Sequence, residues 1–192
     1  MKIKNENITI EKSFTSAVQN HQKKKFKIAE KLYKEILKVN PNHFESIFHL
    51  GMLSAQTNNF NKAKQLLNKA IQIQPNFIAA HYNLGNVQHE LGELEKAVSS
   101  YQKAIEIQPN YANAYYNLGL ILKKIGKFEK AVSAYQKAIE IDPNFIAAYN
   151  NLGIVFKELR EFEKAVSSYQ KAIEIQPHYA NAHYNLGNVQ HE

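Results

Sequence analysis

The chain of 192 residues contains no cysteine. This absence excludes a disulfide framework, a thiolate zinc site and a cysteine nucleophile, and it suits a reducing compartment. No apolar run approaches the ~20 residues that a helix needs to span a bilayer. The first residues, from Met1 to Asn7, lack the continuous apolar stretch of a secretory signal. We therefore expect a cytoplasmic protein without a membrane span.

Proline and glycine are scarce, and their positions are periodic. The five prolines are spaced by 34 residues: Pro41, Pro75, Pro109, Pro143 and Pro177. Five of the seven glycines follow the same spacing: Gly51, Gly85, Gly119, Gly153 and Gly187. A strict period of this length indicates stacked copies of one supersecondary unit. Such a solenoid offers a long surface to another polypeptide and seldom forms a closed catalytic pocket.

The net charge of +7 is concentrated at one end of the chain. Residues 1–40 contain ten lysines and four glutamates, net +6, which leaves +1 for the other residues. A solenoid that binds nucleic acid should carry positive charge along its whole length, so we expect no nucleic acid partner. The lysines at 23, 24, 25 and 27 could contact an anionic partner or a membrane surface. The interpretation that we prefer is a solvated loop and cap.

One repeat, residues 110–143, predicts two helices. From Tyr111 to Ile125 apolar residues recur at steps of three and four, as on one face of a helix. Asn110 is expected to cap this helix, and Gly126 to end it in the left-handed conformation. A second helix begins at Phe128 and ends before Pro143. We interpret Gly119 and Ala131 as packing positions that let the two helices approach closely.

The spacing of these residues resembles the tetratricopeptide repeat (TPR) signature: Tyr115, Leu118, Gly119, Leu122, Ala131, Tyr135, Ala138 and Pro143. The resemblance implies an all-α solenoid, a right-handed superhelix of antiparallel helix pairs with a 34-residue period. The expected segments are an N-terminal tail (1–9), a degenerate capping repeat (10–43), four repeats (44–77, 78–111, 112–145, 146–179) and the first helix of an incomplete repeat (180–192).

The two ends of the array differ. The first repeat has Ser16-Ala17 in place of the Leu-Gly pair and Lys23 in place of an apolar residue, as expected of a polar cap. The last segment is not altered in this way, because residues 182–192 repeat residues 80–90 unchanged. We therefore expect a fragment of a longer array, or end-to-end self-association at the C-terminal edge.

No group of residues suggests catalysis. His81 and His89 are two helical turns apart, ~12 Å along the axis, which is too far for a shared metal ion. His81 and His183 also fall in a packing column, with Ile47, Tyr115 and Tyr149 at the equivalent positions. The chain has no glycine-rich phosphate loop, and no histidine lies at a useful offset from its paired serines. We expect no metal, no cofactor and no enzymatic activity in these residues.

A polar column is the most informative feature for function. Asn83, Asn117, Asn151 and Asn185 each precede the buried leucine of a first helix, and so point away from the packed face. An amide can donate to and accept from a peptide backbone. With Tyr82, Tyr116, Tyr184 and Asn86 they form the predicted peptide groove. The alternative is that recent duplication copied an inert asparagine.

Further resemblances refine the hypothesis. Similar asparagine ladders line the TPR arm of O-linked N-acetylglucosamine transferase. The carboxylate clamp of chaperone-binding TPR proteins is missing, since its positions hold Tyr82, Tyr116, Asn150, Ala79, Asn113 and Ala147. We predict a scaffold that binds an extended or helical protein segment in the concave groove lined by the first helices. The alternative is the substrate-recruiting arm of a larger glycosyltransferase-like or sulfotransferase-like enzyme. Helical-repeat RNA binding fits poorly, because it needs basic or base-reading columns.

Overall fold

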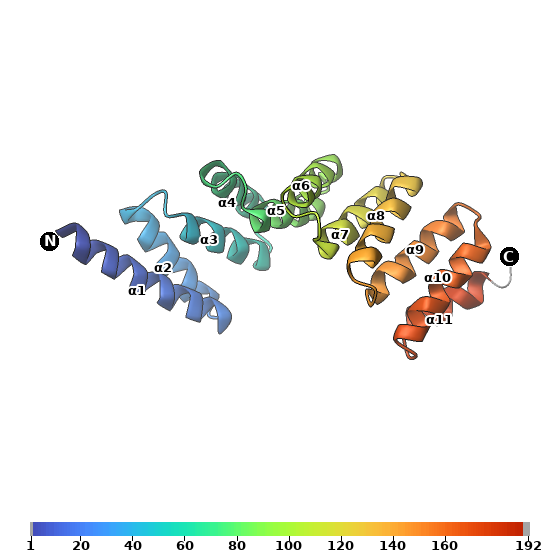
Figure 1. Cartoon of the computed structure of the whole chain (residues 1–192). Coiled ribbons are helices and arrows are strands. Elements are labelled where there is room, and N and C mark those ends of the chain that lie inside the picture. The colour runs from blue at the N-terminus through green and yellow to red at the C-terminus, as the bar shows by residue number, and fades with distance from the viewer. Residues whose placement is uncertain (1, 190–192) are drawn as a thin grey trace. The chain divides into compact units, whose positions relative to one another are not determined.

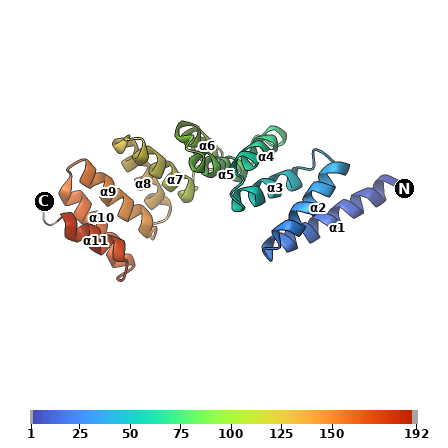
Figure 2. The ribbon, with the colours of Figure 1, turned by 180° about the vertical axis from the view of Figure 1, so that it is seen from behind.

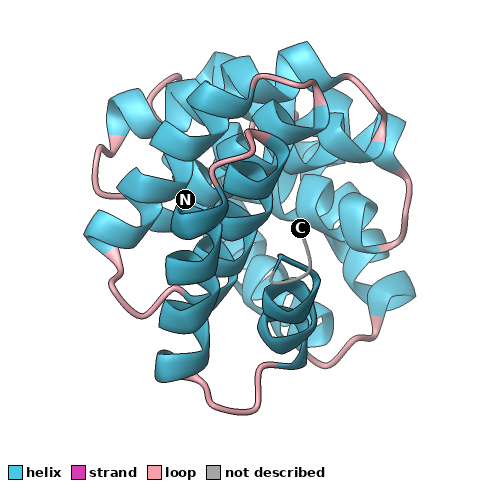
Figure 3. Ribbon diagram, turned by 90° about the vertical axis from the view of Figure 1, so that its right-hand side faces the viewer, coloured by secondary structure: helices cyan, strands magenta, loops and turns pink. Residues whose placement is uncertain are grey.

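A computed structural model describes the backbone of residues 2–189 and the side chains of residues 9–189. Within this part of the chain the regular structure is entirely helical (Figures 1 and 3). The helices are α1 Lys2–Gln22, α2 Phe26–Val39, α3 Phe44–Gln56, α4 Phe60–Ile73, α5 Ile78–Glu90, α6 Leu94–Ile107, α7 Ala112–Lys124, α8 Phe128–Ile141, α9 Ile146–Glu158, α10 Phe162–Ile175 and α11 Ala180–Val189. The all-α repeat solenoid predicted from the sequence is confirmed.

The chain divides into two units, residues 1–93 and residues 94–192. In the first unit α2 contacts α1 and α3, and α4 contacts α3 and α5. In the second unit α8 and α10 each pack between two odd-numbered helices in the same way. The odd-numbered helices also touch one another within each unit, α1 with α3 and α5 with α3, α7 with α9 and α9 with α11. Figures 1 and 2 show consecutive helices of each unit as antiparallel pairs.

Close contact between helices depends on glycine in the second unit. A Cβ atom added at Gly119 would lie 2.7 Å from Cε1 of Tyr135, and one added at Gly153 would lie 2.5 Å from Cε1 of Tyr169. Both tyrosines are fully buried, and Ala131, one turn before Tyr135 on α8, is fully buried as well. Any side chain at these glycines would therefore push the tyrosine ring away. The packing role predicted for Gly119 and Ala131 is correct.

Five turns between paired helices share one backbone conformation. Gly126 has φ +74°, as the sequence predicted for the end of α7. The equivalent positions in the other repeats are Gly92 at +72°, Lys24 at +56°, Asn58 at +58° and Arg160 at +59°. Three of these residues are not glycine, although the left-handed region is unfavourable for side chains with a Cβ atom. The helix packing on either side therefore determines the turn.

The start of α7 differs from the sequence prediction, and α1 is longer than the other helices. The N-cap of α7 is Tyr111, not Asn110, because the helix begins at Ala112 and Asn110 lies in the turn after Pro109. Helix α1 begins at Lys2. No proline or glycine occurs between Lys2 and Gln22, so nothing in that segment interrupts the helix.

Candidate functional site

The repeat register brings three columns of side chains onto the odd-numbered helices. The first column contains Phe14, Phe48, Tyr82, Tyr116, Asn150 and Tyr184. The second contains Thr15, His49, Asn83, Asn117, Asn151 and Asn185, and the third contains Val18, Met52, Asn86, Leu120, Ile154 and Asn188. We call the surface that carries these columns in either unit the first-helix face. All eight residues of the predicted groove belong to it.

Asn151 joins two repeats in the second unit. Its Nδ2 donates to the phenol oxygen of Tyr116 on α7 at 3.2 Å and to the carbonyl of Ala147 at 2.9 Å. Its Oδ1 accepts from Nζ of Lys123, also on α7, at 2.8 Å. The amide is thus used within the protein, and it holds a phenol and an ammonium group in place. Lys123 was absent from the predicted site, since it lies two turns along α7 from Tyr116.

Burial changes the acid–base properties of both partners of Asn151. Burial raises the pKa of Tyr116, Tyr179 adds to this shift, and the hydrogen bond from Asn151 opposes it. Burial lowers the pKa of Lys123, against an opposing effect of Glu158. The Tyr116 ring also packs against Phe145, with ring centroids 4.8 Å apart. Tyr116 is therefore a fixed, half-buried part of the face and not a freely rotating side chain.

The other predicted groove residues differ in their surroundings. Asn83 donates to the carbonyl of Ala79 within its own helix at 2.7 Å, and Asn185 donates to Oδ1 of the buried Asn150 at 3.0 Å. Tyr184 on α11 is 72% exposed, whereas Tyr82 is half-buried on α5. Asn86 and Asn117 are also half-buried. The asparagines at 83, 151 and 185 thus share one column position but have different hydrogen-bond partners.

Two histidines that drew attention in the sequence are structural. Nε2 of His81 bonds to the carbonyl of Pro75 at 2.7 Å, and Nε2 of His183 bonds to the carbonyl of Pro177 at 2.8 Å. Each ring thus fastens the start of a first helix to the preceding turn. His191, the repeat of His89, lies outside the described residues. Among the described residues no three potential metal-binding side chains come together. No described helix is long and apolar enough to cross a membrane.

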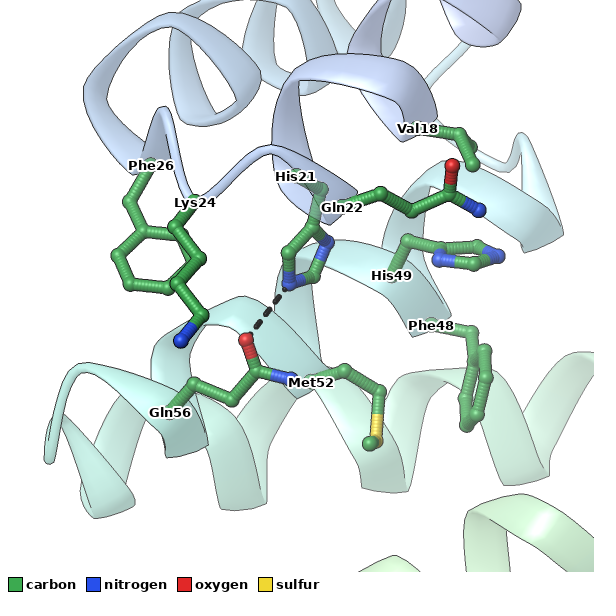
Figure 4. A pocket seen from close by; sticks show the side chains of 9 residues that line it. All are labelled: Val18, His21, Gln22, Lys24, Phe26, Phe48, His49, Met52 and Gln56. Atoms are coloured by element: carbon green, nitrogen blue, oxygen red, sulfur yellow. Dashed lines mark hydrogen bonds between the residues drawn. The ribbon is translucent and has the colours of Figure 1, made fainter.

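A cavity of about 670 Å³ opens on the first-helix face of the first unit. We call it the anchor pocket, and Figure 4 shows its lining. The residues come from α1, the following turn, α2 and α3: Val18, His21, Gln22, Lys24, Phe26, Phe48, His49, Met52 and Gln56. Phe48, His49 and Met52 occupy the same columns as Tyr82, Asn83 and Asn86. The register could have identified these residues, but selecting only asparagine and tyrosine missed them.

Hydrogen bonds fix the imidazole of His21 in the pocket wall. Its Nε2 lies 2.9 Å from Oε1 of Gln56, the bond drawn in Figure 4. An amide oxygen only accepts, so Nε2 carries the proton. Nδ1 lies 3.4 Å from the hydroxyl oxygen of Tyr33. Side chains from α2 and α3 thus hold the ring of His21 in place.

His49 is the second imidazole of the pocket. Its ring stacks on that of Tyr33, with centroids 6.0 Å apart. Burial lowers the pKa of His49, and the neighbouring His21 lowers it further, against a smaller opposing effect of Glu45. His49 is therefore an uncharged part of the pocket wall at neutral pH. Lys24 also lines the pocket.

Comparisons with known proteins agree with this architecture. The family model described as TPR repeat matches residues 54–92, 85–126 and 156–192, and two models described as tetratricopeptide repeat match residues 112–145 and 134–167. The comparison with curated protein sequences found no match.

Three solved structures illustrate the similarity. A crystal structure of MamA is 32% identical, with a TM-score of 0.82, and the alignment covers 85% of this chain and 96% of that one. YrrB, described as a TPR protein with an unusual peptide-binding site, is 24% identical, with a TM-score of 0.80 and coverages of 90% and 89%. MamA from Desulfovibrio magneticus RS-1 is 22% identical, with a TM-score of 0.83 and coverages of 88% and 96%. The chain belongs to the tetratricopeptide repeat family.

Proposed function

We propose that this protein is an interaction scaffold that binds an extended or helical segment of a protein partner on the first-helix face. One observation carries the proposal: the odd-numbered helices of each unit touch, and the repeat register places polar and aromatic side chains in line along them. Such a surface suits recognition of a polypeptide, which repeats its own hydrogen-bonding groups along its length. The site has no catalytic group, and we infer an interaction module and not an enzyme.

The second unit suggests how a backbone would be recognised. The phenol of Tyr116 accepts from Asn151, which leaves its own O–H to donate. Lys123 uses one N–H on Asn151, and an ammonium group has three. These donors suit the carbonyl groups of a bound peptide. We therefore infer that Asn151 acts by positioning Tyr116 and Lys123, and that Tyr184, mostly exposed on α11, adds apolar contact area.

The solved structures support the scaffold, and none of the comparisons lends support to the arm of a glycosyltransferase-like or sulfotransferase-like enzyme. YrrB shares the fold and is described as having a peptide-binding site. The repeat boundaries, the cytoplasmic location and the lack of a nucleic acid partner stay predictions. Self-association at α11 also stays a prediction, and sedimentation of the protein across a concentration series would test it.

Selection from a displayed library of random dodecapeptides would test the proposed function. Peptides selected on the full chain should bind the variant with Asn83, Asn117 and Asn151 changed to alanine at least tenfold more weakly, since each lost hydrogen bond contributes about 1 kcal/mol. The matched control replaces Gln102, Gln136 and Gln170, an exposed amide column on the second helices. Failure to select any binder, or equal binding by both triple variants, would contradict the proposal.

A further inference from the structure

The anchor pocket lies where the second repeat differs from the third on the first-helix face. Where the next repeat carries Asn83 and Asn86, the second repeat carries His49 and Met52, and a cavity of about 670 Å³ opens beside them. Pockets that take small molecules or side chains commonly measure about 300–1,000 Å³. The cavity is therefore large enough to enclose one bulky side chain of a bound segment.

The chemistry of the lining selects an apolar side chain. Phe26, Phe48 and Met52 supply aromatic and thioether surface, and Val18 adds to it. In Figure 4 the Met52 side chain and the Phe48 ring lie on one side, and the Phe26 ring lies on the other. Methionine is flexible and polarizable, so it adapts to side chains of different shape. The polar groups of His21 and Gln56 are already bonded to each other. An apolar side chain bound in the pocket would therefore leave the hydrogen bond between His21 and Gln56 intact.

The charge around the pocket selects acidic neighbours for that anchor. Lys24 lines the pocket, Lys23 and Lys25 are exposed on either side of it, and none of the nine lining residues is acidic. The acidic residue that follows this turn most closely is Glu30 on α2. Its carboxylate is paired with Lys62 at 2.7 Å and with Lys34 at 2.9 Å. Residues 1–40 carry a net charge of +6. Opposite charge on a partner would steer it to this end of the chain.

We propose that the anchor pocket binds an acidic peptide segment, inserting a bulky apolar side chain beside Met52 and placing flanking carboxylates near Lys24. This proposal rests on the proposed function, because it names the partner chemistry on the first-helix face of the first unit. It identifies the lysines at 23, 24 and 25 as part of a binding site and not only as a solvated cap. An anionic membrane surface is the competing occupant and is an outcome of the test below.

Fluorescence anisotropy with the full chain and three labelled synthetic octapeptide pools would test the pocket. The pools carry a central Phe between Glu residues, a central Ala between Glu residues, and a central Phe between Lys residues. We expect the Glu–Phe pool to bind at least tenfold more tightly than either other pool. Met52→Glu should weaken it at least tenfold, as is typical of a central anchor contact. Ile154→Glu, at the same column position of the second unit, is the matched control and should change the affinity little.

A second variant separates lost binding from lost folding. Lys24 has a left-handed backbone, so Lys24→Gly should raise the melting temperature while it weakens the Glu–Phe pool about three- to fivefold. Arg160→Gly removes one positive charge at the equivalent turn of the second unit and should raise the melting temperature without changing binding. If Lys24→Gly and Met52→Glu both bound the Glu–Phe pool like the parent chain, the proposal would be wrong.

Two further outcomes distinguish this proposal from the more general one. Peptides that bind and respond to the asparagine triple variant but not to Met52→Glu or Lys24→Gly would overturn the anchor pocket and keep the scaffold. Cosedimentation with vesicles of phosphatidylcholine and phosphatidylserine tests the competing occupant. Vesicle binding that Lys24→Gly weakens, without binding of the Glu–Phe pool, would assign the pocket to a membrane surface and would overturn the peptide proposal.

Discussion

Gly119 and Tyr135 fit together so closely that a methyl group on the glycine would lie 2.7 Å from the tyrosine ring. Gly187, at the same repeat position on α11, has open space within 4 Å of the equivalent point. Alanine substitutions at these two glycines therefore test the packing of Gly119 against Tyr135. Gly119→Ala should lower the free energy of unfolding by about 1–3 kcal/mol through overpacking. Gly187→Ala should be neutral or stabilising by about 0.5–1 kcal/mol, because alanine is the better helix former.

Urea denaturation followed by circular dichroism would measure both changes. Equal destabilisation by the two variants would contradict this account, since only Gly119 faces a tyrosine ring.

The left-handed turns predict a gain in stability from glycine. Arg160 has φ +59°, a conformation that a Cβ atom disfavours. Arg160→Gly should therefore raise the free energy of unfolding by about 0.5–1 kcal/mol, the strain relief exceeding the entropy cost of glycine. The reciprocal change, Gly126→Arg, should lower it by a similar amount. Thermal denaturation of the two variants checks the signs, and a stabilising Gly126→Arg would contradict this account of the turns.

His49 predicts a loss of stability in mild acid. An unfolded histidine titrates near pH 6.5, and burial and His21 lower the pKa of His49 in the folded chain. Between these two values the unfolded chain binds more protons, so the contribution of His49 to stability falls as the pH drops below about 6.5. The loss ends once the pH is below the folded pKa.

His49→Asn, which installs the residue found in the next three repeats, should remove this part of the pH dependence. Urea titrations at pH 7.5 and pH 5.5 would measure it. His178→Asn, on an exposed turn residue, controls for the loss of a histidine. An identical change in stability between the two pH values for His49→Asn and the parent chain would argue against the prediction.

Asn151 and Asn83 should respond differently to alanine although they share a column. Asn151→Ala removes bonds to Tyr116 and Lys123 and leaves half-buried polar groups without them, which should cost about 1–3 kcal/mol. Asn83 bonds to its own helix through Ala79, so Asn83→Ala should change the stability by less than about 0.5 kcal/mol. Denaturant titration gives both values. A larger loss at Asn83 than at Asn151 would show that the described bonds do not hold the repeats together.

Salt should weaken contacts at the basic end. Charges on exposed side chains are screened beyond about 10 Å at 0.1 M ionic strength. Binding of the Glu–Phe pool should therefore fall severalfold between 0.05 M and 0.5 M salt, whereas peptides selected on the full chain that do not respond to Met52→Glu should be less salt-sensitive. Anisotropy measured across this range checks the difference. Equal salt dependence for both classes would mean that the lysines at 23, 24 and 25 only solvate the chain.

Most of the fold could be predicted from the sequence because each repeat contains the same local signals for helices and turns. The steps of three and four between Tyr111 and Ile125 predicted α7 to within one or two residues of Ala112–Lys124. The glycine at position 126 allowed the left-handed turn to be predicted. Lys24 and Arg160 at the equivalent positions gave no such signal, since their conformation is imposed by the packed helices. The cap at Asn110 was wrong because helix starts depend on the geometry of the whole turn and not on one favourable residue.

The site was less predictable than the fold. The asparagine column was visible as a pattern, yet the pattern says nothing about Lys123, whose amine reaches Asn151 from the neighbouring helix. Nor could it show that Asn185 donates to a buried Asn150. The anchor pocket was missed for a different reason: Phe48, His49 and Met52 keep the register of the groove but not its residue types. Position within the repeat is the better guide to this surface.

The five left-handed turns have a consequence for how such a protein can diversify. Lysine, asparagine, glycine and arginine all occupy the position, and every one of them is exposed. The backbone there tolerates any of these side chains at a cost of about 1 kcal/mol. The charge of the side chain at this turn position can therefore change without changing the helical fold. A single substitution at Lys24 or Arg160 can retune which partners are attracted or repelled, while the helices behind it remain in place.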